Sequence, residues 1–454
     1  MTNDAPAPIT VGFISLGCAK NLVDSQTMAG NLVAANIALA ATPEEADVVV
    51  VNTCSFIEDA REESMETILS ACQLKAEGGC RAVLVAGCLP QRYRDRIKQA
   101  LPDVDAFIGL DELDRVPEIV RALAAGKRDI IEISERSEKL FEPVAPVVFS
   151  GGAHAYLKIA EGCNHQCAFC AIPGIRGRHR SRTLEQVMTE AEKLLSQGFR
   201  ELDIISQDVM SYGRDRKDDA SLPELLRQLG TLGGSFWVRL LYGYPSLISD
   251  ELLEVMASTP QVCHYLDVPI QHSHHDVLRG MRRAETVPHV AAMVRRVRSA
   301  MPDATLRTTC LVGFPGETEA HFEHLLEFCK EMRFDHLGAF VFSPEEDTPA
   351  YEMDAVPPLE VAEDRYARLM EQQKAIVDEN NTAMVGTTVD VLLENADSPD
   401  GTTWRGRCSQ QAPEVDGNTF VENVPSGLGL GDFVKATFTT PYDYDMRATY
   451  EKSR

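Results

Sequence analysis

The stretch Glu161-Gly-Cys-Asn-His-Gln-Cys-Ala-Phe-Cys170 places three thiols at the spacing C-x3-C-x2-C. Thiolates are the usual ligands of iron–sulfur clusters, and a complete [4Fe-4S] cluster takes four of them. Cys163, Cys167 and Cys170 would hold three irons and leave the fourth open for another ligand. A structural zinc ion is the alternative, with His165 as the fourth ligand, but His165 lies between two cysteines in a loop too short to turn it inward easily. The spacing therefore favours an iron–sulfur cluster with an open iron.

Three apolar runs in residues 10–125 each lead to a further cysteine. The runs cover residues 11–14, 48–51 and 82–85, and the cysteines that follow them are Cys18, Cys54 and Cys88. Their alternation with helical segments predicts a parallel α/β domain. Because ligand sites of such sheets lie outside the carboxyl ends of the strands, we expect the three thiols to converge on a second three-cysteine cluster site. The alternative is that small thiols are simply buried at these positions.

The rest of the chain predicts two more domains. Residues 126–150 are charged and proline-containing, as is typical of a connector. In residues 151–382 the alternation resumes, with strands expected at 155–159, 201–206, 236–241, 263–269, 305–312 and 336–342. Six β/α units predict an incomplete relative of the (β/α)8 barrel, with the triple-cysteine loop at its catalytic end. Residues 383–454 alternate β-forming runs with turns, which predicts a small antiparallel β-barrel.

The charge balance restricts the partners of the protein. There are 44 lysines and arginines against 69 aspartates and glutamates, so the formal net charge is −25. The last domain has eleven acidic and six basic residues. Nucleic-acid binders normally carry a basic surface, so we expect no direct nucleic-acid binding, and either a basic partner or none. No apolar stretch is long enough to span a bilayer and no signal-peptide pattern is present, so we expect a cytoplasmic protein. The sequence has no feature that bears on the oligomeric state, and we take a monomer as the expectation.

Eight motifs along the chain together resemble one family. They occupy residues 15–25 (Ser-Leu-Gly-Cys-Ala-Lys-Asn-Leu-Val-Asp-Ser), 52–57, 87–93, 162–173, 176–182, 206–208, 312–318 and 343–350. With these motifs the whole sequence resembles the methylthiotransferases of the radical S-adenosylmethionine (SAM) class, and its last domain resembles a TRAM domain. The motif at 15–25 is most similar to the branch that methylthiolates the β-carbon of an aspartate in ribosomal protein S-twelve of the small subunit.

The resemblance implies two [4Fe-4S] clusters and SAM as cofactors. The auxiliary cluster maps onto Cys18, Cys54 and Cys88, and the SAM-cleaving cluster onto the cysteine loop. An unactivated C–H bond needs a radical rather than a side-chain base. In the implied reaction, one SAM gives a 5′-deoxyadenosyl radical that takes the β-hydrogen, and a second SAM methylates a sulfur held at the auxiliary cluster. The implied partners are the ribosomal protein and an electron donor such as flavodoxin or ferredoxin.

Several other residues are candidates for binding cofactor or substrate. We expect Gln207, Gly313, Pro315, Gly316 and Glu317 to contact SAM, although 313–317 also reads as an ordinary β/α turn. Among Arg176, Arg178, Arg180 and Arg182, one could pair a carboxylate of SAM or substrate, and we expect most to be solvated. We assign no metal to His272, His274 and His275.

The sequence leaves two alternative functions to consider. The first is the same chemistry on an adenosine of tRNA, which the acidic last domain disfavours. The second is a non-catalytic iron–sulfur carrier, which would need neither the barrel nor a SAM site.

Overall fold

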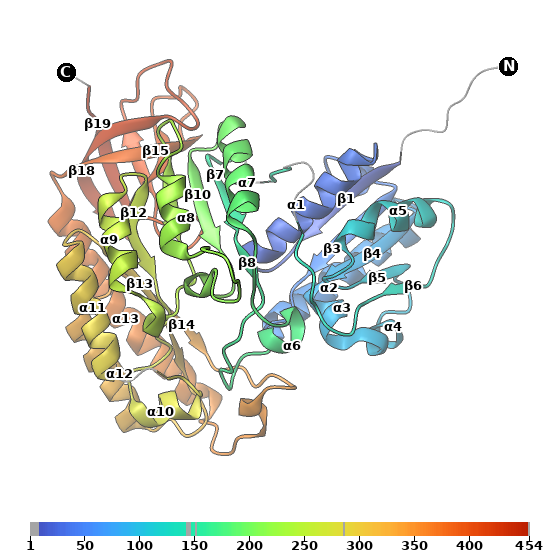
Figure 1. The fold of residues 1–454 in the computed structure, drawn as a ribbon, viewed down its shortest axis with the longest axis horizontal. Coiled ribbons are helices and arrows are strands. Elements are labelled where there is room, and N and C mark those ends of the chain that lie inside the picture. The colour runs from blue at the N-terminus through green and yellow to red at the C-terminus, as the bar shows by residue number, and fades with distance from the viewer. Residues whose placement is uncertain (1–8, 142–146, 150–151, 285–286, 453–454) are drawn as a thin grey trace.

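The computed structural model describes residues 9–141, 147–149, 152–284 and 287–452. Within them the chain forms two six-stranded parallel sheets and a closed five-stranded barrel, which lie in chain order from blue to red in Figure 1. The predicted fold class is confirmed.

The first sheet has the strand order β2-β1-β3-β4-β5-β6. Its strands are β1 (Thr10–Ser15), β2 (Ala38–Leu39), β3 (Val48–Thr53), β4 (Ala82–Gly87), β5 (Ala106–Ile108) and β6 (Ile130–Glu132). Its helices are α1 (Ala19–Ala34), α2 (Glu58–Ala76), α3 (Cys88–Tyr93), α4 (Ile97–Ala100) and α5 (Val116–Ala124). Strand β6 falls inside the segment 126–150 that we expected as a connector, and residues 142–146 and 150 of that segment lie outside the described residues.

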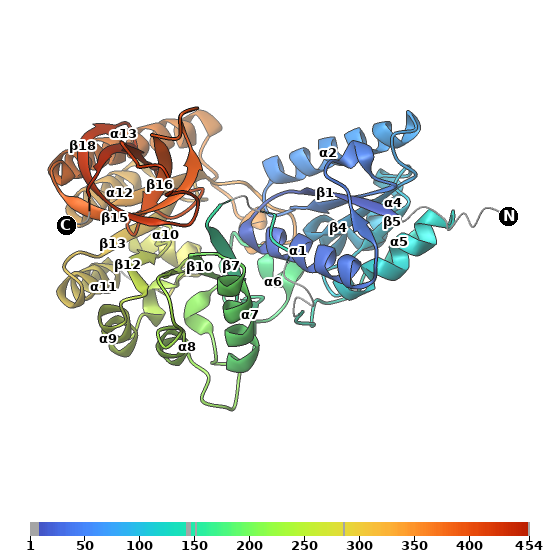
Figure 2. The same ribbon diagram turned by 90° about the horizontal axis from the view of Figure 1, so that it is seen from above.

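The valine run of β3 explains why this sheet is covered on both faces. Val48 and Val50 pack towards α1 and α5, whereas Val49 and Val51 pack towards α2 and α3. Successive side chains of a strand point to opposite faces, so an unbroken apolar run needs helices on both sides. Figure 2 shows α2 on one side of the sheet and α1 with α5 on the other.

The second sheet forms the core domain, in the order β14-β13-β12-β11-β10-β7. Its strands are β7 (His154–Lys158), β10 (Glu201–Ile205), β11 (Trp237–Leu240), β12 (Val262–Asp267), β13 (Thr305–Val312) and β14 (His336–Val341). Its helices are α7 (Leu184–Ser196), α8 (Leu222–Leu229), α9 (Asp250–Ser258), α10 (His275–Gly280), α11 (Val287–Ala300) and α12 (Glu319–Met332). All six predicted strands are present, and the sheet stays open between β7 and β14, as expected for a partial barrel. Two short strands, β8 (Ala160–Glu161) and β9 (Arg180–Ser181), and helix α6 (Ile172–Arg176) flank the cysteine loop.

The last domain follows the long helix α13 (Leu359–Met384). It is a closed barrel of β15 (Thr388–Ala396), β16 (Trp404–Cys408), β17 (Thr419–Glu422), β18 (Phe433–Tyr442) and β19 (Asp445–Tyr450). Four strand pairs are antiparallel as expected, but β17 and β19 run parallel. The small β-barrel predicted for residues 383–454 is thus present, with one parallel pair among its strands.

The segment between β16 and β17, residues 409–416, fills the amino-terminal end of the core sheet, and we refer to it as the plug segment. Tyr156 donates to Glu414 (2.9 Å) and Tyr265 donates to Asp416 (2.7 Å). Arg239 donates to the carbonyl oxygen of Ser409 (2.7 Å). Further contacts come from Arg307 to Asp416 and from His336 to the carbonyl oxygen of Gln410. The plug segment therefore contacts strands β7, β11, β12, β13 and β14, and the cysteine loop is left at the opposite end of the sheet (Figure 1).

A buried ionic network joins the barrel to the core domain beside the plug segment. Arg407 of β16 pairs with Glu201 of β10 (2.7 Å) and with Glu394 of β15 (2.6 Å), and Glu201 also pairs with Arg239 (2.6 Å). These side chains are almost completely buried. Two arginines hold the pKa of Glu201 below its usual value, although burial alone would raise it.

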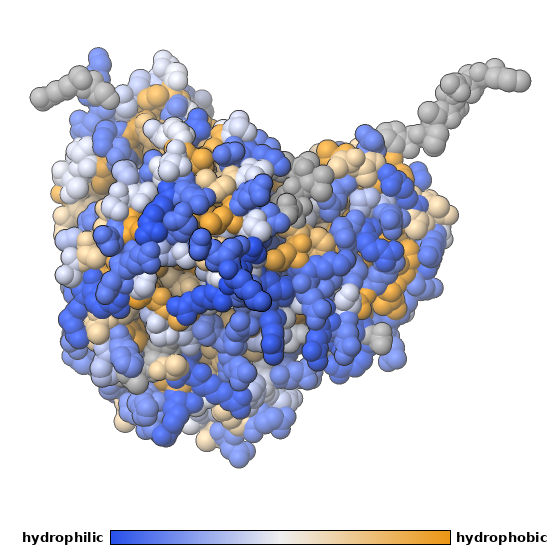
Figure 3. All heavy atoms as spheres, viewed as in Figure 1, coloured by the Kyte–Doolittle hydropathy of each residue, from blue (hydrophilic) through white to orange (hydrophobic). Residues whose placement is uncertain are grey.

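The surface in Figure 3 is predominantly hydrophilic, with apolar residues in small separate groups. Among the described residues, no helix combines the length and apolar character that crossing a membrane requires.

Candidate active site

The first three cysteines converge at the carboxyl ends of neighbouring strands. Cys18 follows β1, Cys54 follows β3 and Cys88 opens α3 after β4, and these strands are adjacent in the order β1-β3-β4. The thiols of Cys54 and Cys18 are close enough to act electrostatically on Cys88. Burial is the main cause that raises the pKa of Cys88 to about 12, so this sulfur needs a cation or a metal to become a thiolate.

The second three cysteines lie in the loop after β8, held by backbone hydrogen bonds. Cys163 N–H donates to the carbonyl oxygen of Gly177 (3.1 Å), and Cys170 N–H donates to that of Cys167 (3.1 Å). Gly162 adopts φ +77°, and a Cβ there would lie 2.2 Å from the carbonyl oxygen of Arg178. The loop thus requires glycine at this position. Burial raises the pKa of Cys163 to about 11 and that of Cys170 to about 12.

The contacts of His165 argue against zinc. A closed structural zinc site takes four ligands, and His165 is the fourth ligand considered above. His165 instead bonds to Asp208 (2.8 Å) and stacks on Tyr244. The cysteine loop is therefore left with three thiols, which suits an iron–sulfur cluster with an open iron.

A buried ionic network lies between the two cysteine trios. Arg176 pairs with Glu161 (2.9 Å) and with Asp24 of α1 (2.9 Å). Lys158 pairs with the same two carboxylates, at 2.5 Å to Asp24 and 2.8 Å to Glu161. Burial would raise the pKa of Glu161, but Arg176 and Lys158 hold it well below its usual range. This network fixes α1 of the first domain against the start of the cysteine loop.

The expectation that most arginines of the 176–182 run are solvated is wrong. Arg176 is 1% exposed and Arg182 is 4% exposed. Arg182 pairs with Glu190 of α7 (2.5 Å), whereas Arg180 donates to backbone carbonyls and to Ser137. Arg178 alone is exposed, as expected. The arginine run alone does not indicate these buried partners, one of which, Asp24, lies 152 positions from Arg176.

The candidate SAM residues divide into two places. Gln207 donates to Glu161 (2.7 Å) and so lies at the start of the cysteine loop. Glu317 is buried and accepts from the N–H groups of Gly313 (2.6 Å) and Phe314 (3.1 Å). Gly313, at φ +76°, faces Ala362 of α13, where a Cβ would lie 2.6 Å from the alanine Cβ. Gly316, at φ +81°, faces open space. Glu317 and Gly313 thus shape the loop itself, in which Pro315 is buried and Gly316 is exposed.

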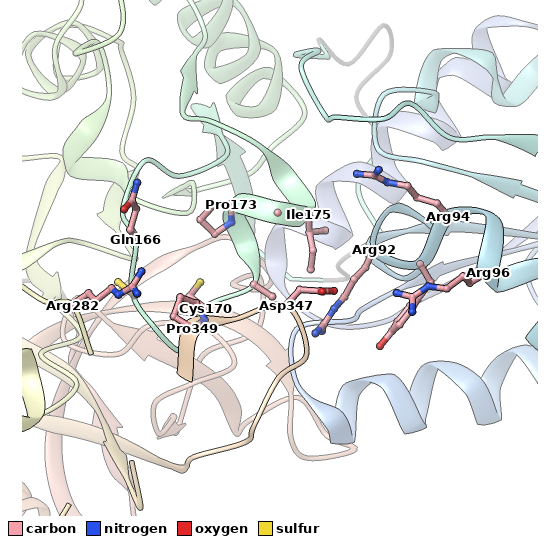
Figure 4. A pocket seen from close by; sticks show the side chains of 14 residues that line it. Arg92, Arg94, Arg96, Gln166, Cys170, Pro173, Ile175, Arg282, Asp347 and Pro349 are labelled. Atoms are coloured by element: carbon pink, nitrogen blue, oxygen red, sulfur yellow. The ribbon is translucent and has the colours of Figure 1, made fainter. Parts of the chain in front are cut away.

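A cavity of about 680 Å³ opens between the first domain and the cysteine loop. Cys170 and Arg282 lie on one side of it, and Arg92, Arg94 and Arg96 lie on the other (Figure 4). Cys167 also lines the cavity. The cavity therefore combines access to two loop thiols with a concentration of positive charge in an acidic protein.

Sequence reasoning missed Asn21, Asp24, Lys158 and Glu161. A signal was present for two of them, since Asn21 and Asp24 are three residues apart on one face of α1, directly after Cys18. Both are buried, and buried polar side chains require partners.

Comparison with known proteins agrees with this arrangement. Residues 10–109 match the model of Uncharacterized protein family UPF0004, residues 157–329 that of the Radical SAM superfamily, and residues 385–450 that of the TRAM domain. A protein of Geobacter sulfurreducens named ribosomal protein uS12 methylthiotransferase RimO is 41% identical over 96% of this chain and 97% of its own. The protein of that name from Symbiobacterium thermophilum is 44% identical over 97% of this chain and 91% of its own. This chain belongs to the RimO family.

Solved structures share the fold of the RimO family chain at low sequence identity. The radical SAM methyltransferase TsrM from Kitasatospora setae, solved with cobalamin and a [4Fe-4S] cluster, has a TM-score of 0.57 at 14% identity, covering 76% of this chain and 77% of its own. The cobalamin-dependent radical SAM enzyme OxsB has a TM-score of 0.52 at 12% identity, covering 82% of this chain and 56% of its own. The resemblance to radical SAM methylthiotransferases is confirmed, and it implies one [4Fe-4S] cluster and SAM as cofactors.

Proposed function

We propose that this chain adds a methylthio group to the β-carbon of an aspartate in ribosomal protein uS12. The observation that carries the proposal is the pair of three-cysteine sites, at the ends of two different sheets and joined by one buried ionic network. A transferase that both removes a hydrogen and inserts sulfur needs two such sites. An iron–sulfur carrier needs only one and has no use for the cavity beside the loop.

Each site residue has a role in this proposal. Cys18, Cys54 and Cys88 hold the auxiliary [4Fe-4S] cluster, and Cys163, Cys167 and Cys170 hold the SAM-binding one. The remaining residues, Gln207, Gly313, Pro315, Gly316 and Glu317, bind or shape the site of SAM. When bound, these groups would supply the radical that removes the β-hydrogen and the sulfur that replaces it.

The cavity orients the substrate. Within the described part of the chain, Arg96 and Arg282 form no ion pair with a carboxylate; Arg282 lines the cavity on the side of the loop thiols, and Arg96 lines it on the opposite side. A guanidinium binds a carboxylate through two parallel hydrogen bonds, which fixes both position and orientation. The substrate aspartate would therefore be held by its carboxylate while its β-carbon faces the cysteine loop.

The proposal extends to domains, partners and location. Residues 10–125 carry the auxiliary site, 126–150 connect it, 151–382 form the radical SAM core, and 383–454 form the TRAM-like barrel. The acidic chain meets the basic uS12 as a cytoplasmic monomer, receives electrons from a donor such as flavodoxin or ferredoxin, and binds no nucleic acid directly.

The test compares reconstituted wild-type protein with Cys18/Cys54/Cys88→Ala. We expect about eight irons per chain to fall to about four, because each cluster holds four. With SAM, reductant and uS12, the wild type should give uS12 carrying one methylthio group by mass spectrometry, and the variant should still cleave SAM but leave uS12 unmodified. About four irons in both proteins, or methylthiolation of tRNA but not of uS12, would overturn the proposal.

A further inference from the structure

We propose that Arg176 is the positioning residue of the auxiliary cluster site, which it holds in place and whose reduction potential it raises by donating an N–H to the Cys88 sulfur. This inference rests on the proposed function, because it concerns the auxiliary cluster assigned there.

The geometry around Arg176 uses both ends of its guanidinium. Nη2 lies 3.5 Å from Cys88 Sγ, 2.5 Å from Asn21 Oδ1 and 2.9 Å from Asp24 Oδ2. Nη1 lies 2.9 Å from Glu161 Oε1. A planar group with several donors can reach the sulfur and the carboxylates together, which a lysine ammonium cannot do in the same way.

Asn21 makes the arrangement rigid. Its Oδ1 accepts from Arg176, while its Nδ2 donates to the carbonyl oxygen of Thr53 (2.8 Å), one residue before Cys54. One side chain therefore ties the guanidinium to the backbone beside a second auxiliary cysteine. Arg176 and Asn21 together reach both Cys88 and the strand end that carries Cys54.

The electrostatic effect follows from burial. Arg176 is 1% exposed, so water screens its charge weakly. A reduced cluster has one more negative charge than an oxidised one, and a nearby N–H donor or cation stabilises it. Lys20 also acts electrostatically on Cys18, but its ammonium lies over the ring of Tyr242, 3.1 Å from the centroid.

Arg176 also connects the two cysteine sites mechanically. It is the last residue of α6, six positions after Cys170, and α6 packs against α3, whose first residue is Cys88. Figure 1 shows α6 at the junction of the first domain with the core. A displacement of the loop that carries Cys163, Cys167 and Cys170 would therefore move the guanidinium that contacts Cys88.

The test isolates the auxiliary cluster in the full-length chain with Cys163/Cys167/Cys170→Ala. Its midpoint potential is measured by redox titration followed by electron paramagnetic resonance, after iron analysis has confirmed about four irons per chain. At the potential that reduces half of the parent clusters, we expect Arg176→Gln to lower the ratio of reduced to oxidised clusters about tenfold, which is 59 mV for a one-electron couple. Arg176→Lys keeps the positive charge but loses the planar guanidinium with its several N–H donors. Its ratio of reduced to oxidised clusters should therefore fall between that of the parent and that of Arg176→Gln.

Arg182→Gln is the matched control, because Arg182 is also buried and ion-paired but bonds to Glu190 and backbone carbonyls. Its midpoint should equal that of the parent. An unchanged midpoint in Arg176→Gln would overturn the inference. If Arg176→Gln retains no iron, the midpoint potential of Arg176→Lys is compared with that of the parent instead. Equal midpoint potentials of these two proteins would then overturn the inference. A parent chain without iron would instead contradict the proposed function itself.

Discussion

At the scale of single residues, the auxiliary cysteines depend on one glycine. Gly17 adopts φ +86°, and a Cβ there would lie 2.6 Å from the Cβ and 3.0 Å from the sulfur of Cys54. Any side chain at this position must displace a proposed cluster ligand. We expect Gly17→Ala to lower the iron content after reconstitution from about eight to about four per chain, measured by iron and acid-labile sulfide analysis.

Gly78→Ala provides the control for backbone strain. Gly78 has nearly the same conformation, φ +84°, but no atom lies within 4 Å of its Cβ position. It should keep about eight irons. A Gly17→Ala protein with full iron would show that Cys54 is not a ligand in the arrangement described above.

Glu161 is the residue on which the buried network between the sites depends. It pairs with Lys158 and Arg176 and accepts from Gln207, so Glu161→Ala leaves these two buried cations to share the carboxylate of Asp24. Removing one partner of a buried pair costs about 3–5 kcal/mol. We expect a free energy of unfolding lower by this amount in chemical denaturation, whereas Glu192→Ala on the exposed face of α7 should change it by less than about 0.5 kcal/mol. Equal effects would show that the network contributes nothing to stability.

At the scale of elements, helix α13 and the loop at 313–317 depend on each other. Gly313→Ala would place its Cβ 2.6 Å from Ala362 and push the loop away from the helix. Overpacking of this kind costs about 1–3 kcal/mol, so we expect SAM to bind about tenfold more weakly in equilibrium dialysis with reconstituted protein.

Comparison with Gly316→Ala separates the effect of the steric clash with Ala362 from the effect of backbone strain. Gly316 also has a positive φ, +81°, but its Cβ would meet nothing within 4 Å. Its loss of SAM affinity should be clearly smaller than that of Gly313→Ala. If Gly316→Ala is the weaker binder, SAM contacts the exposed turn directly and the packing against α13 has little influence.

At the scale of the whole molecule, the barrel is fixed to the core by the Arg407 network. Arg407→Met leaves Glu201 with Arg239 and removes the pairing of Glu394, which should lower the free energy of unfolding by about 3–5 kcal/mol. Arg447→Met removes an exposed pair with Glu422, worth about 0–1 kcal/mol. Denaturant unfolding of both variants measures the difference. Similar values for the two would mean that the barrel is held by apolar contacts alone.

Short-range patterns in the sequence were sufficient for much of this structure. The apolar runs before Cys18, Cys54 and Cys88 predicted a parallel sheet, and the rule for strand ends then predicted the convergence of these thiols. The six core strands followed from the same alternation. Contacts between distant segments were not predictable: Arg176 meets Asp24 across 152 positions, and Tyr265 meets Asp416 across 151. The plug segment has no periodicity at all, because its partners and not its own pattern determine its conformation.

The plug segment sets an order of events during synthesis. Tyr156, Arg239 and Tyr265 belong to the core, yet their partners are Glu414, Ser409 and Asp416, which the ribosome adds after the last core strand is complete. At about 5–20 residues per second, the nascent core waits roughly 4 to 15 s with these polar side chains exposed. A chain that ends prematurely after α13 never covers them. Such a product should be recognised by the cell's chaperones and proteases, so that only molecules with a completed barrel persist long enough to receive their iron.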